Sequence, residues 1–194
     1  MGTLARTLST NQQTGDGLPT DQRHCYTGIM VGLCGILMIF TGFTSAYLVR
    51  RGIGGDWQSI PLPSLIWVNT LILLTSSLCL EYARRSVQNI PVLWRWWITA
   101  TALGLTFLFG QGIVWKQLWG MGLFLSSNPS SSFFYLFTAT HGIHLLGGIV
   151  ALLGMTLKLY KGRLHQVHVN VMAIYWHFMD GLWIFLLLLF VVGR

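Results

Sequence analysis

The chain has 194 residues, of which 53% are hydrophobic and only 9% are charged, whereas a soluble globular domain has roughly 25% charged residues. This composition excludes an ordinary soluble domain and indicates an integral membrane protein. The net charge of +7 comes from 12 Lys and Arg against 5 Asp and Glu, and most basic residues lie in short segments between apolar stretches. The charge is therefore a signal of membrane topology rather than a surface for nucleic acid.

The first 25 residues are polar and rich in turn-forming residues. They lack the apolar core and the cleavage site of a secretory signal, so we expect residues 1–25 to form a mobile tail.

Five apolar stretches follow the tail, and each is long enough to cross a bilayer. A helix needs about 20 residues to span about 30 Å of hydrocarbon. Their apolar residues are spread evenly rather than alternating, which favours helices over the strands of a barrel. We predict an all-α integral membrane bundle of five transmembrane helices in residues 26–194, with spans near 26–49, 62–80, 92–118, 133–159 and 167–192.

The connecting segments predict the orientation of this bundle. Five crossings place eight basic residues on the side of the amino terminus and four on the opposite side. The positive-inside rule then puts the amino terminus in the cytoplasm and the carboxyl terminus outside. The first group comprises Arg6, Arg23, Arg84, Arg85, Arg95, Lys158, Lys161 and Arg163, and the second comprises Arg50, Arg51, Lys116 and Arg194.

Four features of the first three spans predict local contacts. Gly28 and Gly32 are four residues apart in the first span, the spacing of a small-residue motif for helix packing. Glu81 precedes two arginines at the end of the second span, and we expect a local salt bridge there rather than a catalytic role. Gln111 in the third span needs a polar partner, and Trp97 near its start is expected to be an interfacial anchor.

The last two spans contain the main candidates for chemistry, because ionisable groups inside a membrane are costly. His141 and His144 are three residues apart in the fourth span, and His177 and Asp180 are three apart in the fifth. Each pair should lie on one face of its helix, and the two pairs are in a position to face each other across a helix interface.

Two interpretations of this polar patch remain open from the residues alone. One is a metal or haem site in which histidines of two helices clamp the iron, as in a membrane b-type cytochrome. The other is a structural contact in which buried polar groups bond across helices, at about 0.6 kcal/mol per bond. Gly142, Gly147 and Gly148 indicate close helix packing and favour the second interpretation. A small transporter or channel with the same patch is a third hypothesis.

Two motifs on these helices resemble the cytochrome c oxidase subunit III family. They are THGIHLLGG at residues 140–148 and YWHFMDGLWIFL at residues 175–186, which includes Tyr175 and Trp176. TGFTSAYLVRRG at residues 41–52 is similar to the same family. The resemblance runs from Tyr26 to the carboxyl terminus, and it implies a short five-helix bacterial form that lacks the first two helices of the seven-helix form.

The resemblance implies a non-catalytic subunit of a proton-pumping respiratory oxidase in the bacterial plasma membrane. The haem and copper would belong to the partner catalytic subunit, subunit I, and no metal or catalytic residue is expected on this chain. The family also implies bound phospholipid, protection of the enzyme during turnover and contact with other oxidase subunits. Whether the oxidase joins a larger respiratory assembly is left open.

One position departs from the family pattern. Ile36 stands where many members have a membrane-embedded glutamate that pairs with a histidine of the last helix. His177 is therefore expected to find another partner, such as Asp180 or a group on the helix of His141.

Overall fold

The structure is a computed structural model that describes residues 20–53, 55, 57–58, 60–160 and 166–193. Five long α-helices account for nearly all of the described residues, and each is long and apolar enough to cross a membrane. They are α2 (Thr20–Ile53), α3 (Leu65–Arg85), α4 (Ile90–Gly120), α5 (Pro129–Tyr160) and α6 (Gln166–Val192).

The predicted all-α bundle of five spans is confirmed, and the helices run several residues beyond most of the expected spans. The first helix begins at Thr20, so residues 20–25 of the expected tail belong to α2. The rest of that tail, residues 1–19, lies outside the described residues, as do Lys161, Arg163 and Arg194 from the charge count.

Local sequence signals account for the boundaries of α4. The Asn89 side chain caps its first turn by accepting a hydrogen bond of 3.4 Å from the Val92 amide, and Pro91 occupies the first turn, where its missing N–H costs nothing. After α4 ends at Gly120, the chain turns through Gly122, whose φ of 76° suits a glycine.

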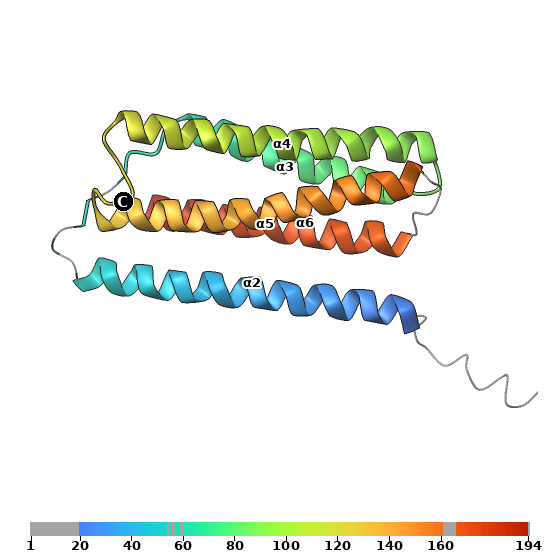
Figure 1. The fold of residues 1–194 in the computed structure, drawn as a ribbon, viewed down its shortest axis with the longest axis horizontal. Coiled ribbons are helices and arrows are strands. Elements are labelled where there is room, and N and C mark those ends of the chain that lie inside the picture. The colour runs from blue at the N-terminus through green and yellow to red at the C-terminus, as the bar shows by residue number, and fades with distance from the viewer. Residues whose placement is uncertain (1–19, 54, 56, 59, 161–165, 194) are drawn as a thin grey trace, which may run out of the picture.

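Four of the helices form the body of the bundle, and the fifth lies along one side of it (Figure 1). Helix α3 packs against α4 and α6, and α5 packs against α4 and α6. Helix α2 contacts α5 and α6, and has no contact with α3 or α4 among the described helices. The bundle is therefore compact around α6 and more open along α2.

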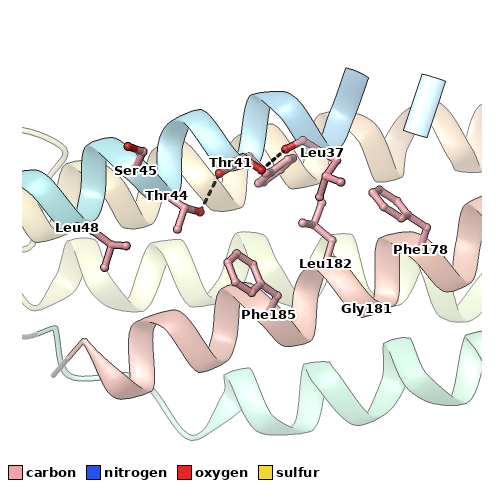
Figure 2. Close-up of a pocket in the computed structure, with 10 residues that line it drawn as sticks. Leu37, Thr41, Thr44, Ser45, Leu48, Phe178, Gly181, Leu182 and Phe185 are labelled. Atoms are coloured by element: carbon pink, nitrogen blue, oxygen red, sulfur yellow. Dashed lines mark hydrogen bonds between the residues drawn. The ribbon is translucent and has the colours of Figure 1, made fainter. Parts of the chain in front are cut away.

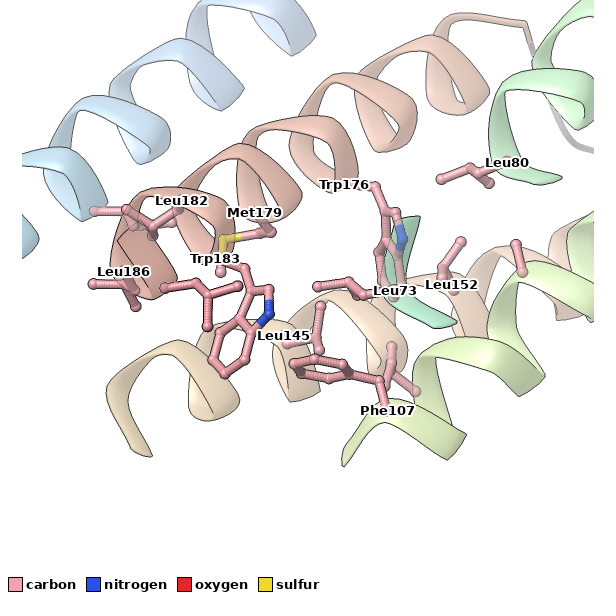
Figure 3. Packing of buried hydrophobic residues seen from close by; sticks show 14 of the residues in the cluster. Leu73, Leu80, Phe107, Leu145, Leu152, Trp176, Met179, Leu182, Trp183 and Leu186 are labelled. Atoms are coloured by element: carbon pink, nitrogen blue, oxygen red, sulfur yellow. The ribbon is translucent and has the colours of Figure 1, made fainter. Parts of the chain in front are cut away.

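The core lies between α3, α4, α5 and α6, and large side chains of α6 fill much of it (Figure 3). Trp176 and Trp183 of α6 and Phe107 of α4 are almost completely buried. Trp97 is buried as well, and its indole nitrogen donates to the Leu152 carbonyl at 3.3 Å and to the Thr156 hydroxyl at 3.1 Å. The prediction that Trp97 anchors the chain at the membrane interface is therefore wrong.

Candidate functional site

The two motifs on α5 and α6 lie side by side in the bundle. The Tyr175 hydroxyl donates a hydrogen bond of 2.7 Å to the backbone carbonyl of His144. Next to this bond, the Tyr175 and Trp176 rings lie against Gly148, where a Cβ would come within 2.8 Å of Tyr175 Cε1 and 3.3 Å of Trp176 Cζ3. Glycine at position 148 thus allows α6 to approach α5 closely.

His141 lies in the interior of the bundle and is 1% exposed. Its ring centroid is 5.1 Å from that of Trp183 and 6.1 Å from that of Phe107. Neither ring nitrogen has a hydrogen-bond partner among the described residues. The imidazole therefore contributes to a cluster of rings that joins α4, α5 and α6.

His144 has different neighbours, although it is only three residues further along α5. Its Nδ1 donates to the Thr140 carbonyl at 2.8 Å, since a carbonyl oxygen only accepts. Its ring centroid is 6.1 Å from that of Phe40 on α2. His141 thus contacts α4 and α6, while His144 contacts α2, although the two lie only three residues apart on α5.

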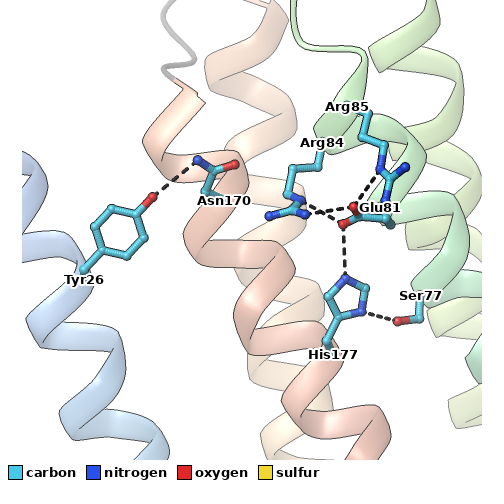
Figure 4. A network of polar contacts seen from close by, with 7 residues as sticks. All are labelled: Tyr26, Ser77, Glu81, Arg84, Arg85, Asn170 and His177. Carbon is cyan, nitrogen blue, oxygen red and sulfur yellow. Dashed lines mark hydrogen bonds and ion pairs between the residues drawn. The ribbon is translucent and has the colours of Figure 1, made fainter.

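His177 faces α3 rather than α5 (Figure 4). Its Nδ1 lies 2.5 Å from the Ser77 hydroxyl, and its Nε2 lies 3.4 Å from Glu81 Oε2. A carboxylate only accepts, so Nε2 carries the hydrogen of that contact, and in a neutral ring Nδ1 accepts from Ser77. The expectation that His177 pairs with Asp180 or with the helix of His141 is therefore wrong.

Glu81 connects this contact to the arginines at the end of α3. Its carboxylate accepts hydrogen bonds from Arg84 at 2.7 and 2.8 Å and from Arg85 at 2.8 Å. The predicted local salt bridge is confirmed, and it includes the histidine of α6 as well. Ser77, Glu81, Arg84, Arg85 and His177 form a polar cluster, here called the α3–α6 polar cluster, at one end of the bundle.

Asp180 is almost completely buried, at 4% exposure, one turn after His177. Neither carboxyl oxygen has a hydrogen-bond partner among the described residues. Asp180 thus lies beside the α3–α6 polar cluster, and the expected contact between the pair on α6 and the pair on α5 does not form.

The three intraspan histidines do not fit a haem clamp between α5 and α6. His141 is enclosed by aromatic rings, His144 faces α2, and His177 faces α3. Within the described part of the chain, no group of three or more His, Cys, Asp or Glu side chains has an arrangement suited to a metal ion.

The glycines predicted to mediate helix packing divide into two groups. Gly148 lies against α6, but Gly28, Gly32, Gly142 and Gly147 have no heavy atom within 4 Å of a Cβ placed on them. These four glycines therefore make no close contact with another described helix, so the close packing predicted around the histidines does not occur at Gly142 or Gly147 within the described residues.

Gly104 and Gly110 on α4 also make close contacts, which their sequence context did not predict. A Cβ at Gly104 would lie 2.8 Å from Trp176 Cζ2, and one at Gly110 would collide with the Asn69 side chain. Asn69 uses that space to donate to the Phe107 carbonyl at 3.0 Å and to Gln111 Oε1 at 3.5 Å. Gln111 thus has the polar partner that its position required, on α3.

An apolar groove runs between α2 and α6 (Figure 2). Its volume is about 640 Å³. The Thr41 and Thr44 hydroxyls on its wall donate to the carbonyls of their own helix at 2.8 and 2.7 Å, so the groove presents few free polar groups. This α2–α6 groove is lined by Leu37, Phe40, Thr41, Thr44, Ser45, Leu48, Phe178, Gly181, Leu182 and Phe185.

Comparisons with known proteins identify a single family. The family model for cytochrome c oxidase subunit III matches residues 15–193. The chain is 33% identical to cytochrome c oxidase subunit 3 of Thermostichus vulcanus, over 95% of this chain and 98% of that protein. It is 30% identical to the probable cytochrome c oxidase subunit 3 of Mycobacterium leprae, over 81% and 82%. It is also 30% identical to cytochrome c oxidase subunit 3 of Synechocystis sp., over 84% and 72%.

Proposed function

This chain belongs to the cytochrome c oxidase subunit III family, and from that membership we propose that it binds phospholipid and stabilises the catalytic subunit of a haem-copper oxidase. It is a multi-pass membrane protein and a subunit of the oxidase complex. In this proposal the partner catalytic subunit holds the haem and copper and carries out oxygen reduction and proton pumping. The chain itself contributes helix packing and lipid contact.

The α2–α6 groove is the main structural feature that supports lipid binding. Its walls are apolar because Phe178 and Phe185 line it and the threonine hydroxyls are bonded to their own helix. An acyl chain in the groove gains van der Waals contact with both walls, and the threonine hydroxyls keep their hydrogen bonds to their own helix.

Basic residues at one end of α2 support the same assignment. Arg50 and Arg51 follow Leu48, the last groove residue of α2, within one turn. Arg51 Nη2 donates to the Val192 carbonyl at the end of α6, at 3.3 Å. Arginine near the mouth of an apolar groove favours a phosphate headgroup there, because the two charges attract.

The charge distribution supports a cytoplasmic amino terminus. At the end of the bundle where α2 begins, the described helices carry Arg23, Arg84, Arg85, Arg95 and Lys158, and at the other end they carry Arg50, Arg51 and Lys116. By the positive-inside rule, this excess of basic residues supports a cytoplasmic location for the first end. Labelling of single cysteines from each side of intact cells tests this orientation.

The lipid-binding proposal is tested with a pair of glycine variants in the assembled oxidase. Gly181 lines the α2–α6 groove, whereas Gly147 on α5 does not, and a Cβ at either position meets no heavy atom within 4 Å. Gly181→Leu should fill the groove, and Gly147→Leu is the matched control.

Purified Gly181→Leu complexes should lose a phospholipid, detected by lipid mass spectrometry, and should inactivate sooner during turnover. Their initial rate of oxygen consumption should equal that of the unaltered complex. Equal lipid content and equal working life in the two variants would contradict the proposal.

A further inference from the structure

Helix α2 is attached firmly to the bundle near its carboxyl-terminal end. The Tyr47 ring is 2% exposed and packs edge-to-face on Phe133 of α5 and Phe190 of α6, with ring centroids 5.6 and 6.3 Å apart. One turn further along α2, Arg51 donates to the Val192 carbonyl of α6. Aromatic pairs and this hydrogen bond therefore hold the end of α2 against both neighbouring helices.

The amino-terminal half of α2 lies more openly on the bundle. Helix α2 is the least buried of the five described spans. Between Arg23 and Met38, the buried side chains are those of Leu33 and Ile36. An apolar side chain gains little by exchanging acyl chains for another helix, because both surroundings are apolar. These two side chains therefore hold this half of α2 only weakly.

A hydrogen bond links the same half of α2 to α6 (Figure 4). Asn170 Nδ2 donates to the Tyr26 hydroxyl oxygen at 3.3 Å, and both side chains are partly buried. Acyl chains offer no acceptor to replace the hydroxyl, so separation of the two side chains has a cost that separation of apolar side chains lacks. We call this pair the Tyr26–Asn170 latch.

The latch and the α2–α6 groove lie along the same two helices. The groove residues begin at Leu37 on α2 and at Phe178 on α6. Leu37 follows Tyr26 by eleven residues, about 16 Å, and Phe178 follows Asn170 by eight residues, about 12 Å. The latch therefore lies beyond one end of the groove, and the Tyr47 contacts lie near the other end.

This arrangement makes the width of the groove depend on the latch. Tyr26 lies 21 residues from Tyr47, about 32 Å, whereas Leu37 lies ten residues from Tyr47, about 15 Å. If α2 pivots at Tyr47, a movement away from α6 at Tyr26 reaches Leu37 at about half its size. A broken latch leaves α2 free to make this movement, and a closed latch opposes it.

We infer that the Tyr26–Asn170 latch controls how fast phospholipid enters and leaves the α2–α6 groove, with α2 pivoting on its Tyr47 contacts. The inference rests on the proposed function, because it takes the phospholipid in that groove from it. Lipid enters and leaves through an open state that the latch disfavours. The latch therefore changes the exchange rate, and leaves the amount of lipid bound at equilibrium the same.

Lipid exchange in the assembled oxidase tests the latch. The purified complex in nanodiscs is mixed with an excess of vesicles of deuterated phosphatidylethanolamine and phosphatidylglycerol. Native mass spectrometry then follows replacement of the retained lipid that Gly181→Leu removes.

Tyr26→Phe removes the acceptor of the latch and should speed this exchange about threefold, the effect of one average hydrogen bond between membrane helices. The amount of lipid bound should not change. Tyr82→Phe is the matched control, because the Tyr82 ring contacts Trp96 of α4 rather than α2 or α6. Equal exchange rates in the two variants would overturn the inference. Less lipid bound in Tyr26→Phe would also overturn it, because Tyr26 would then belong to the binding site.

The variant Asn170→Leu tests whether the two side chains act as one latch. It should speed exchange by the same factor as Tyr26→Phe, and the double variant should be no faster than either, because each change removes the same bond. Factors that multiply in the double variant would overturn the inference.

The outcomes also separate the latch from the proposed function. If the unaltered oxidase retains no phospholipid that Gly181→Leu removes, both fail. If it retains that lipid, and Tyr26→Phe exchanges it at the unaltered rate, only the latch fails.

Discussion

Trp183 on α6 donates a hydrogen bond of 3.0 Å from its indole nitrogen to the hydroxyl of Thr70 on α3. The Thr70 hydroxyl in turn donates to the Ile66 carbonyl at 2.8 Å. The Trp183 ring also lies 5.1 Å from the rings of Phe107 and His141, measured between centroids. One side chain of the family motif thus contacts three other helices.

Thr70→Val should destabilise the chain within its complex. The substitution preserves the shape of the side chain but leaves the buried indole N–H without an acceptor, at a cost of about 1 to 3 kcal/mol. The midpoint of thermal dissociation measures this loss. Thr75→Val is the matched control, because Thr75 is exposed and bonds only to the Leu71 carbonyl of its own helix. Equal midpoints for the two variants would contradict the assignment.

Gly148→Ala should weaken the contact between α5 and α6. The added Cβ would lie 2.8 Å from Tyr175 Cε1, and relief of such overpacking costs about 1 to 3 kcal/mol. Gly147→Ala on the same helix meets no heavy atom within 4 Å and should be nearly neutral. Thermal inactivation of the purified oxidase distinguishes them, and a neutral Gly148→Ala would show that α6 does not approach α5 as described.

His177 and Ser77 should be energetically coupled across α3 and α6. A double-mutant cycle with His177→Ala and Ser77→Ala should give a coupling of about 0.6 kcal/mol, the average for such bonds in membrane proteins. The matched cycle pairs Ser77→Ala with His144→Ala, because His144 faces α2 instead, and its effects should be additive. Coupling in the second cycle and none in the first would contradict the described orientations.

His141→Ala and Asp180→Asn should shorten the working life of the oxidase while leaving its initial oxygen consumption nearly intact. Both side chains are buried inside this chain, and His141→Ala opens a cavity between the rings of Phe107 and Trp183. The time course of oxygen consumption measures both quantities in one trace. Immediate loss of turnover in a fully assembled complex with normal haem spectra would show that these residues take part in catalysis.

The five helices could be predicted from the sequence because span length depends on a simple quantity, the thickness of the hydrocarbon layer. The rotation of each helix was not predictable in the same way. In lipid, an apolar residue gains little by facing the bundle, so apolar residues surround a helix such as α5 on all sides. The spacing of His141 and His144 predicts neighbouring positions on α5, but it does not predict that one ring contacts α2 and the other contacts α6.

The contacts of His177 and Trp97 depend on side chains whose position the sequence does not reveal. Ser77 and Glu81 became partners of His177 because α3 lies against α6, a neighbour relation between distant segments. The position of Trp97 near the end of a predicted span suggests an interfacial anchor. In the structure α4 begins at Ile90, so Trp97 lies about two turns inside the helix. Helix adjacency, rather than residue type, decided both cases.

Native purification of the chain from its own membranes in mild detergent tests whether it is a haem-free subunit of a haem-copper oxidase. The measurement is the ratio of haem-copper catalytic subunit to this chain, together with the haem that remains on the chain after the subunits are separated. We predict one catalytic subunit per chain and no haem on the isolated chain. A chain that purifies without a catalytic subunit, or that retains its own stoichiometric haem, would contradict this role.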